Sequence, residues 1–177
     1  MIVGGVSIIV FGRNCGTDFQ KTIQEVESLA RARPDEDFEL ILIDDASDAV
    51  PNWKVESSLF SNLTVRKLPF RQGISGAIYT GTQYATKEYL MWLPGSNMYG
   101  HKSMENLLNA AGYSDLVLGY RVNLYTARPP LKLFFSLLLR AFMHLLTFHF
   151  VADFKGLNLY KTKHVRTWLN PEAEHGG

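Results

Sequence analysis

The chain has 177 residues, a formal net charge of +1 and a hydrophobic content of 46%. This length and composition suit one globular domain with a sizeable core, spanning residues 1–177, and exclude an intrinsically disordered chain. With a charge near zero and no run of lysines or arginines, we expect no nucleic-acid partner. The single cysteine, Cys15, excludes an internal disulfide and a thiolate zinc cluster, which indicates a cytoplasmic setting.

Predicted strands and helices alternate along the chain. In order they are a strand at 6–11, a helix at 17–31, strands at 38–43 and 63–68, a helix at 73–86, a strand at 89–93, a helix at 103–111 and a strand at 115–119. Thr17 is the expected N-cap of the first helix. This alternation predicts an α/β fold with helices on both faces of a mostly parallel sheet. The loops after the first, second and fourth strands should share one rim, where ligands of such sheets bind.

The most apolar segment is 131–151, but Lys132, Arg140 and His144 interrupt it and argue against a transmembrane span. Its polar residues fall on one side of a helix, so we expect an amphipathic helix at about 130–150. The apolar face is wider than a surface helix needs. Two interpretations stay open: peripheral contact with a membrane surface or partner, and burial within the chain's own domain.

The second predicted strand ends abruptly at Asp44, Asp45 and Ser47. Carboxylates at the carboxyl end of a parallel strand can accept hydrogen bonds from a ribose, a base N–H or a metal-bound water. The alternative is a solvated turn in which Ser47 or Asp48 caps a helix.

Four segments in order form a series: 6–14, 43–47, 71–77 with Gly81, and 153–160. The series resembles the family 2 glycosyltransferases with the GT-A fold, particularly the branch that transfers a sugar from a nucleotide to a polyprenyl phosphate. The resemblance implies a three-layer sandwich, Rossmann-like, with a nucleotide-binding half at about 1–100 and an acceptor half at about 101–170.

The resemblance also implies a donor site. Asn14 matches the first residue of the family's Asn-Glu pair and Cys15 replaces the Glu, while Asp44 or Asp45 would lie beside the base or ribose. Arg71 and the N–H groups of the helix that begins at Gly73 would face the diphosphate, although the glycines there can equally serve the turn and close helix packing. The implied nucleotide-binding residues are Phe11, Arg13, Asn14, Asp44, Asp45, Ser47, Arg71, Gly73, Gly76, Pro94, Gly95 and Ser96.

One departure concerns the metal. The family usually has Asp-x-Asp after its fourth strand, and the second carboxylate binds a divalent cation, whereas this chain reads Pro94-Gly95-Ser96. The remaining candidate ligands for Mg²⁺ or Mn²⁺ are Ser96, Asn97 and Asp153. Since the diphosphate supplies charged oxygens of its own, a metal can still bind through the substrate.

The implied reaction is an inverting transfer from a nucleotide sugar to a polyprenyl phosphate or another membrane-associated glycan, in cell-wall or glycan biosynthesis at the cytoplasmic face of a membrane. Asp153 would be the general base for a hydroxyl acceptor, and Arg121, in a Gly-x-Arg resembling that of the lipid-phosphate branch, would hold a phosphate of donor or acceptor. The candidate acceptor residues are Arg128, Lys155 and Asn158. The alternative is a catalytically degenerate module of the same fold that binds a nucleotide sugar or belongs to a membrane assembly.

Overall fold

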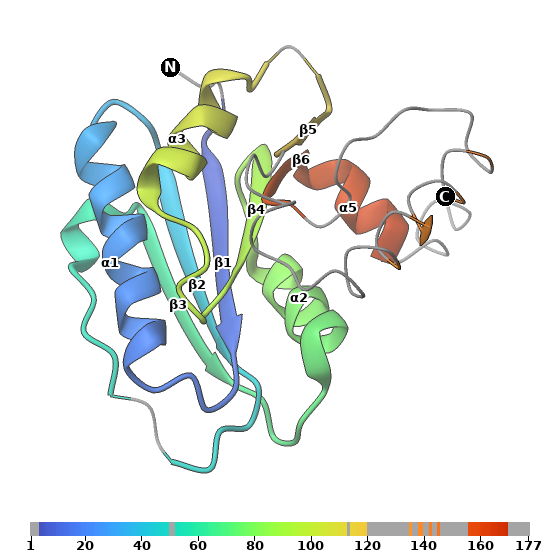
Figure 1. The fold of residues 1–177 in the computed structure, drawn as a ribbon. Helices are drawn as coiled ribbons and strands as arrows, with labels where there is room; N and C mark the ends of the chain where they lie inside the picture. The colour runs from blue at the N-terminus through green and yellow to red at the C-terminus, as the bar shows by residue number, and fades with distance from the viewer. Residues whose placement is uncertain are drawn as a thin grey trace, which may run out of the picture.

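A six-stranded sheet forms the centre of the protein (Figure 1). The structure is a computed structural model that describes residues 4–49, 52–112, 114–119 and 156–169, together with the single helical positions 135, 138, 139, 142 and 145. The strands are β1 (Val6–Gly12), β2 (Phe38–Asp44), β3 (Asn62–Lys67), β4 (Tyr89–Pro94), β5 (Leu116–Leu118) and β6 (Asn158–Lys161). Their order is β3-β2-β1-β4-β6-β5, with β1 to β4 parallel and β6 antiparallel to both of its neighbours. The predicted mostly parallel sheet is therefore confirmed.

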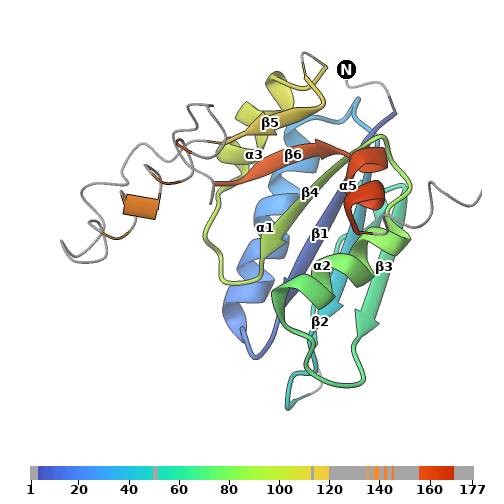
Figure 2. The same cartoon turned by 90° about the vertical axis from the view of Figure 1, so that its right-hand side faces the viewer.

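Helices cover both faces of this sheet and make three layers (Figures 1 and 2). The helices are α1 (Thr17–Ala32), α2 (Gly73–Tyr84), α3 (His101–Asn109) and α5 (Thr162–Leu169), with a 3₁₀ turn, η1 (Ser57–Leu59). The pair α1 and α3 lies on one face and the pair α2 and α5 on the other. One detail of the prediction is wrong: Gly16 is the N-cap of α1, and Thr17 is its first helical residue, with no side-chain cap.

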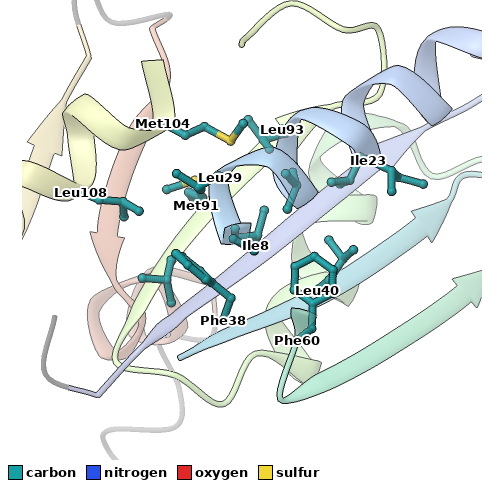
Figure 3. Packing of buried hydrophobic residues seen from close by; sticks show 14 of the residues in the cluster. Ile8, Ile23, Leu29, Phe38, Leu40, Phe60, Met91, Leu93, Met104 and Leu108 are labelled. Carbon is teal, nitrogen blue, oxygen red and sulfur yellow. The ribbon is translucent and has the colours of Figure 1, made fainter. Parts of the chain in front are cut away.

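The core explains why the central strands read as unbroken apolar runs. Every residue of β2 is buried, as are the first six of β1, because side chains on both faces meet a helical layer. Ile8 and Leu40 face α1, where Ile23 and Leu29 pack on them (Figure 3). Ile9 belongs to the smaller cluster under α2.

A buried carboxylate fixes the amino end of the sheet. Glu39 in β2 is fully buried and accepts hydrogen bonds from the Ser7 hydroxyl in β1 and from the backbone N–H and hydroxyl of Thr86. The Ser7 hydroxyl in turn accepts the Lys87 N–H at 3.1 Å. Because these groups satisfy one another, the amino ends of β1, β2 and β4 are held together without exposed polar groups.

Candidate active site

The loops at the carboxyl ends of the strands meet along one edge, at the foot of Figure 1. In register, Asp44 lies opposite Gly12 and Lys67, and Pro94 lies opposite Phe11. We call segments 12–16, 44–49, 67–73 and 94–97 the carboxyl-end rim. Backbone hydrogen bonds join them, including Asp45 N–H to the Gly12 carbonyl at 2.9 Å. The expectation that the loops after the first, second and fourth strands share a rim is confirmed.

Backbone strain is concentrated in this rim. In the part of the chain that the structure describes, three residues other than glycine have a positive φ: Asn14 (52°), Ala46 (56°) and Asn97 (52°). Each lies in a different rim loop. Such conformations cost of order 1 kcal/mol or more and cluster where a backbone must take one shape for a ligand. Ala46 is the most informative, because it has no polar side chain to offset the cost.

Asp45 caps a helix from a distance in sequence. Its two carboxylate oxygens accept the backbone N–H groups of Gln72 at 2.6 Å and Gly73 at 2.9 Å, at the start of α2. A buried carboxylate at this position satisfies two orphan donors and complements the helix dipole. The Asp45 carboxylate therefore has a structural role. The first amides of α2, which the sequence suggested for a diphosphate, already bind this internal anion.

Asp44, in contrast, has a free acceptor. Its Oδ1 accepts the Ser47 N–H at 3.2 Å and the Ser47 hydroxyl. Its Oδ2 is buried without a hydrogen-bond partner in the part of the chain that the structure describes, and Lys67 Nζ lies 3.8 Å away. A buried carboxylate oxygen left unpaired is unfavourable, so its presence calls for an explanation such as a ligand.

The first rim loop is clamped to the second. Arg13 donates to the Ala46 carbonyl at 3.1 Å and to Asp48 at 2.9 Å. The Asn14 amide exchanges two hydrogen bonds with Asp48, at 2.7 and 3.0 Å. The Asn14 bond, followed by the Arg13 charge, lowers the pKa of Asp48. Arg13 and Asn14, the two residues of this loop that were predicted to bind the nucleotide, therefore stabilise the shape of the rim.

Cys15 occupies the place where the resemblance expects a carboxylate. Burial is the main cause of a raised pKa of its thiol, so the side chain is uncharged at neutral pH. Its Sγ lies 3.6 Å from the Arg13 carbonyl. The loop consequently offers one charge fewer than an Asn-Glu pair would.

The remaining predicted donor residues reach the same edge. Arg71 is exposed, and the described residues offer its guanidinium no hydrogen bond or ion pair. Gly73 takes the positive φ (73°) needed for the turn into α2, and Gly76 lies against the Gln72 side chain. Gly95 packs on the Phe19 ring, where a Cβ would come within 2.3 Å, while Ser96 is exposed.

We tested whether the rim fits a divalent metal. Within the described ranges no group of three or more His, Cys, Asp or Glu side chains is arranged to hold an ion. Pro94 has no side-chain ligand, and Ser96 and Asn97 offer neutral oxygens only. Since Mg²⁺ and Mn²⁺ prefer charged oxygens, these residues do not fit such an ion.

Four of the predicted site residues lie outside the described residues: Arg121, Arg128, Asp153 and Lys155. Asn158 is described and is 8% exposed. Its Oδ1 accepts the Gly119 N–H at 3.2 Å and its Nδ2 donates to the Tyr160 hydroxyl at 3.0 Å. The Asn158 side chain is therefore engaged between β5 and β6.

A cavity of about 1000 Å³ lies beside the rim, between the start of α1 and residues 47, 49 and 52–56. Asn14 and Ser47 line it, and so does Trp53, which stacks on Phe19 with ring centroids 3.9 Å apart. No sequence pattern indicates a role for Trp53. Gln20 in its wall exchanges two hydrogen bonds with the Lys54 backbone. On its Asn14 and Ser47 side the cavity is continuous with the rim.

The fold and the rim define a GT-A protein, with the nucleotide-sugar transferase architecture. The family model described as glycosyl transferase family 2 matches residues 7–123, and the chain belongs to this family. No curated protein sequence matches the chain.

Solved structures agree on the fold. S. aureus TarS 1-349 in complex with UDP-GlcNAc aligns with a TM-score of 0.59 at 12% identity, over 92% of this chain and 46% of that one. The mannosyltransferase PcManGT from Pyrobaculum calidifontis, in complex with GDP-Man and Mn²⁺, aligns with a TM-score of 0.58 at 16% identity, over 92% and 46%. The chain thus spans less than half the length of either protein.

Proposed function

We propose that this chain is a glycosyltransferase that moves a sugar, with inversion, from a nucleoside diphosphate sugar to a membrane-associated acceptor. The observation that carries the proposal is the buried Oδ2 of Asp44, which has no hydrogen-bond partner among the described residues, on the strained rim of a family 2 fold. A base N–H or a ribose hydroxyl would satisfy this oxygen. The UDP-GlcNAc and GDP-Man bound by the two structural neighbours support the same ligand class.

The nucleotide-binding half at about 1–100 would hold the base at Asp44 and Ser47 and the diphosphate towards Arg71. Charge develops on the departing diphosphate during an inverting displacement, so a cation there lowers the barrier. For a hydroxyl acceptor, Asp153 would take the proton. A phosphate acceptor is already an anion and needs no base.

A lipid phosphate is the acceptor that we favour. The backbones of Gly119 and Gly156 touch, since a Cβ on Gly156 would come within 1.8 Å of the Gly119 carbonyl oxygen. In the sequence, Arg121 lies two residues after Gly119 and Lys155 lies one residue before Gly156. Arginine and lysine side chains are common partners of a phosphate group.

Membrane contact through the 131–151 helix is part of the proposal. Phe135, Leu138, Leu139, Phe142 and Leu145 are helical and 49–69% exposed, at a spacing that puts them on one stripe. Such a stripe, in a segment of the sequence that also contains Lys132 and Arg140, suits an anionic bilayer surface at the cytoplasmic face. Among the described residues, no helix has the length and hydrophobicity needed to cross a bilayer.

The donor assignment is tested by calorimetric titration of the chain with UDP, GDP, dTDP and CDP. We expect at least one to bind, and the matching nucleotide sugar to be hydrolysed slowly or transferred to a polyprenyl phosphate. If none of the four binds, with or without Mn²⁺, the proposal is wrong.

The membrane assignment is tested by sedimentation with phosphatidylglycerol vesicles. The pair Leu138→Glu and Phe142→Glu should lower binding at least tenfold, because each apolar side chain contributes about 1.5–3 kcal/mol when buried. Val65→Glu is the matched control, since Val65 is 49% exposed on β3. If the unchanged protein, the double variant and Val65→Glu bind the vesicles equally well, the apolar stripe does not contact the membrane.

A degenerate binding module is the second candidate, favoured by the loss of both carboxylates at Pro94 and Ser96. Nucleotide binding without transfer or hydrolysis of any common nucleotide sugar would select the module over the enzyme.

A further inference from the structure

The rim, whose described residues form no group arranged to hold a metal ion, also has an unusual charge balance. Segments 12–16, 44–49, 67–73 and 94–97 contain three cations and three carboxylates, so their formal charge is zero. An Asp-x-Asp at Pro94 and Ser96 would make the same rim doubly negative, and one divalent ion would return it to zero. Losing two carboxylates and one ion together therefore leaves the charge that faces a diphosphate unchanged.

Of the three rim cations, one has no hydrogen bond or ion pair among the residues that the structure describes. Arg13 is held by Asp48 and the Ala46 carbonyl. Lys67 donates to the Ser47 carbonyl at 2.9 Å and neighbours Asp44. Arg71 has neither kind of partner among the described residues and is exposed.

The backbone position of Arg71 is fixed, although its side chain has no partner within the described part of the chain. The adjacent Gln72 N–H is bound by Asp45, and Asp45 N–H is bound by the Gly12 carbonyl of β1. Arg71 therefore enters the rim from a backbone anchored to the central strands. A guanidinium on a fixed backbone can bind two phosphate oxygens at once and loses less freedom in doing so.

We infer that this chain binds a nucleoside diphosphate without a divalent metal, with the Arg71 guanidinium as the cation that faces the diphosphate. The inference rests on the proposed function, because it concerns the same donor site. It separates this chain from the structural neighbour described with GDP-Man and Mn²⁺.

The first test is a calorimetric titration with UDP and GDP, in EDTA and then in Mn²⁺. We expect the affinity in EDTA to equal or exceed that in Mn²⁺, because Mn²⁺ bound to the free nucleotide neutralises the charge that Arg71 attracts. A tightening of tenfold or more by Mn²⁺ overturns the inference and leaves the proposed function standing. Failure of both nucleotides under both conditions overturns the inference, and the proposed function also falls if dTDP and CDP fail.

The second test restores the missing ligands. Pro94→Asp with Ser96→Asp should weaken binding in EDTA about tenfold through added negative charge, and Mn²⁺ should recover it. Pro94→Asn with Ser96→Asn is the neutral control and should show no metal response. Ser96 is exposed, so Ser96→Asp alone is the variant least able to disturb the fold. If the Asp variants bind as the unchanged protein does in EDTA, the charge argument is wrong.

The third test removes the cation. Arg71→Gln should lower affinity about tenfold, equivalent to about 1.4 kcal/mol, in EDTA. Arg66→Gln is the matched control, because Arg66 lies over the Tyr84 ring, 4.9 Å from its centroid, rather than in the rim. Equal effects of the two substitutions would show general charge attraction and would overturn the role of Arg71.

Discussion

Asp44 and Asp45 are adjacent at the end of β2, but substitution by asparagine should have different effects at the two positions. It should lower stability at Asp45 and nucleotide affinity at Asp44. Asp45→Asn removes the charge at the start of α2 and turns one of two acceptors into a donor that faces an N–H group. The loss of one charge-assisted hydrogen bond, about 1.5–3 kcal/mol, and of the dipole contribution, about 0.3–1 kcal/mol, adds to about 2–4 kcal/mol of unfolding free energy.

Asp44→Asn should leave stability within about 1 kcal/mol. The substitution keeps Oδ1 as the acceptor for Ser47 and replaces Oδ2, which has no hydrogen-bond partner in the described structure. It loses only the ion pair with Lys67, whose side chain is 45% exposed. Nucleotide affinity should instead fall roughly 10- to 100-fold, because the ligand loses a hydrogen bond to a charged acceptor.

Urea unfolding gives the stability of both variants, and calorimetric titration with the nucleotide that binds best gives their affinities. Asp35→Asn, in the exposed turn between α1 and β2, is the control for loss of a carboxylate and should change neither quantity appreciably. If Asp44→Asn destabilises the protein as much as Asp45→Asn and leaves affinity unchanged, Asp44 is a structural residue and our assignment is refuted.

Three further outcomes test the framework that supports the rim. Glu39→Gln should lower the unfolding free energy by about 2–4 kcal/mol in urea, because a buried acceptor of three hydrogen bonds becomes partly a donor; a loss under about 1 kcal/mol would contradict this. Hydrogen bonds from His101 lower the pKa of Glu25, so their stabilising effect is present above pH 4.5 and is lost as pH falls through the folded-state pKa. Glu25→Gln should flatten the stability profile below pH 4.5, and an unchanged acid limb would argue against the pairing. Gly81→Ala should cost about 1–3 kcal/mol, since its Cβ would lie 2.6 Å from Ile9 Cγ2, and Ile9→Ala should reduce that cost in a double-mutant cycle.

The central strands could be predicted because burial on both faces leaves a continuous apolar run in the sequence. The strand β6 has no such signal: Asn158–Lys161 is short and partly polar, and it pairs with Tyr89 and Leu90 from a distant part of the chain. Its antiparallel place between β4 and β5 depends on that tertiary pairing, which local pattern does not encode. The helix α5, which follows it directly, was missed for the same reason.

The location of the site could be predicted from the sequence, but the roles of its individual residues could be predicted less well. The rim follows from strand order, so Asp44, Asp45 and Arg71 could be grouped from sequence alone. The sequence could not tell which aspartate is free, because Asp45 finds its partners 27 and 28 residues away in the chain. Asn14 was expected to contact the nucleotide, but its amide is bound to Asp48, an interaction that neither loop indicates by itself.

Amide hydrogen exchange with and without the best-binding nucleoside diphosphate tests the central claim most directly. If the carboxyl-end rim is the donor site, protection should increase in segments 12–16, 44–49, 67–73 and 94–97, while the opposite end of the sheet, around Glu39 and Thr86, should exchange as before. Protection confined to the cavity wall around Trp53, or to the amino end of the sheet, would contradict the account.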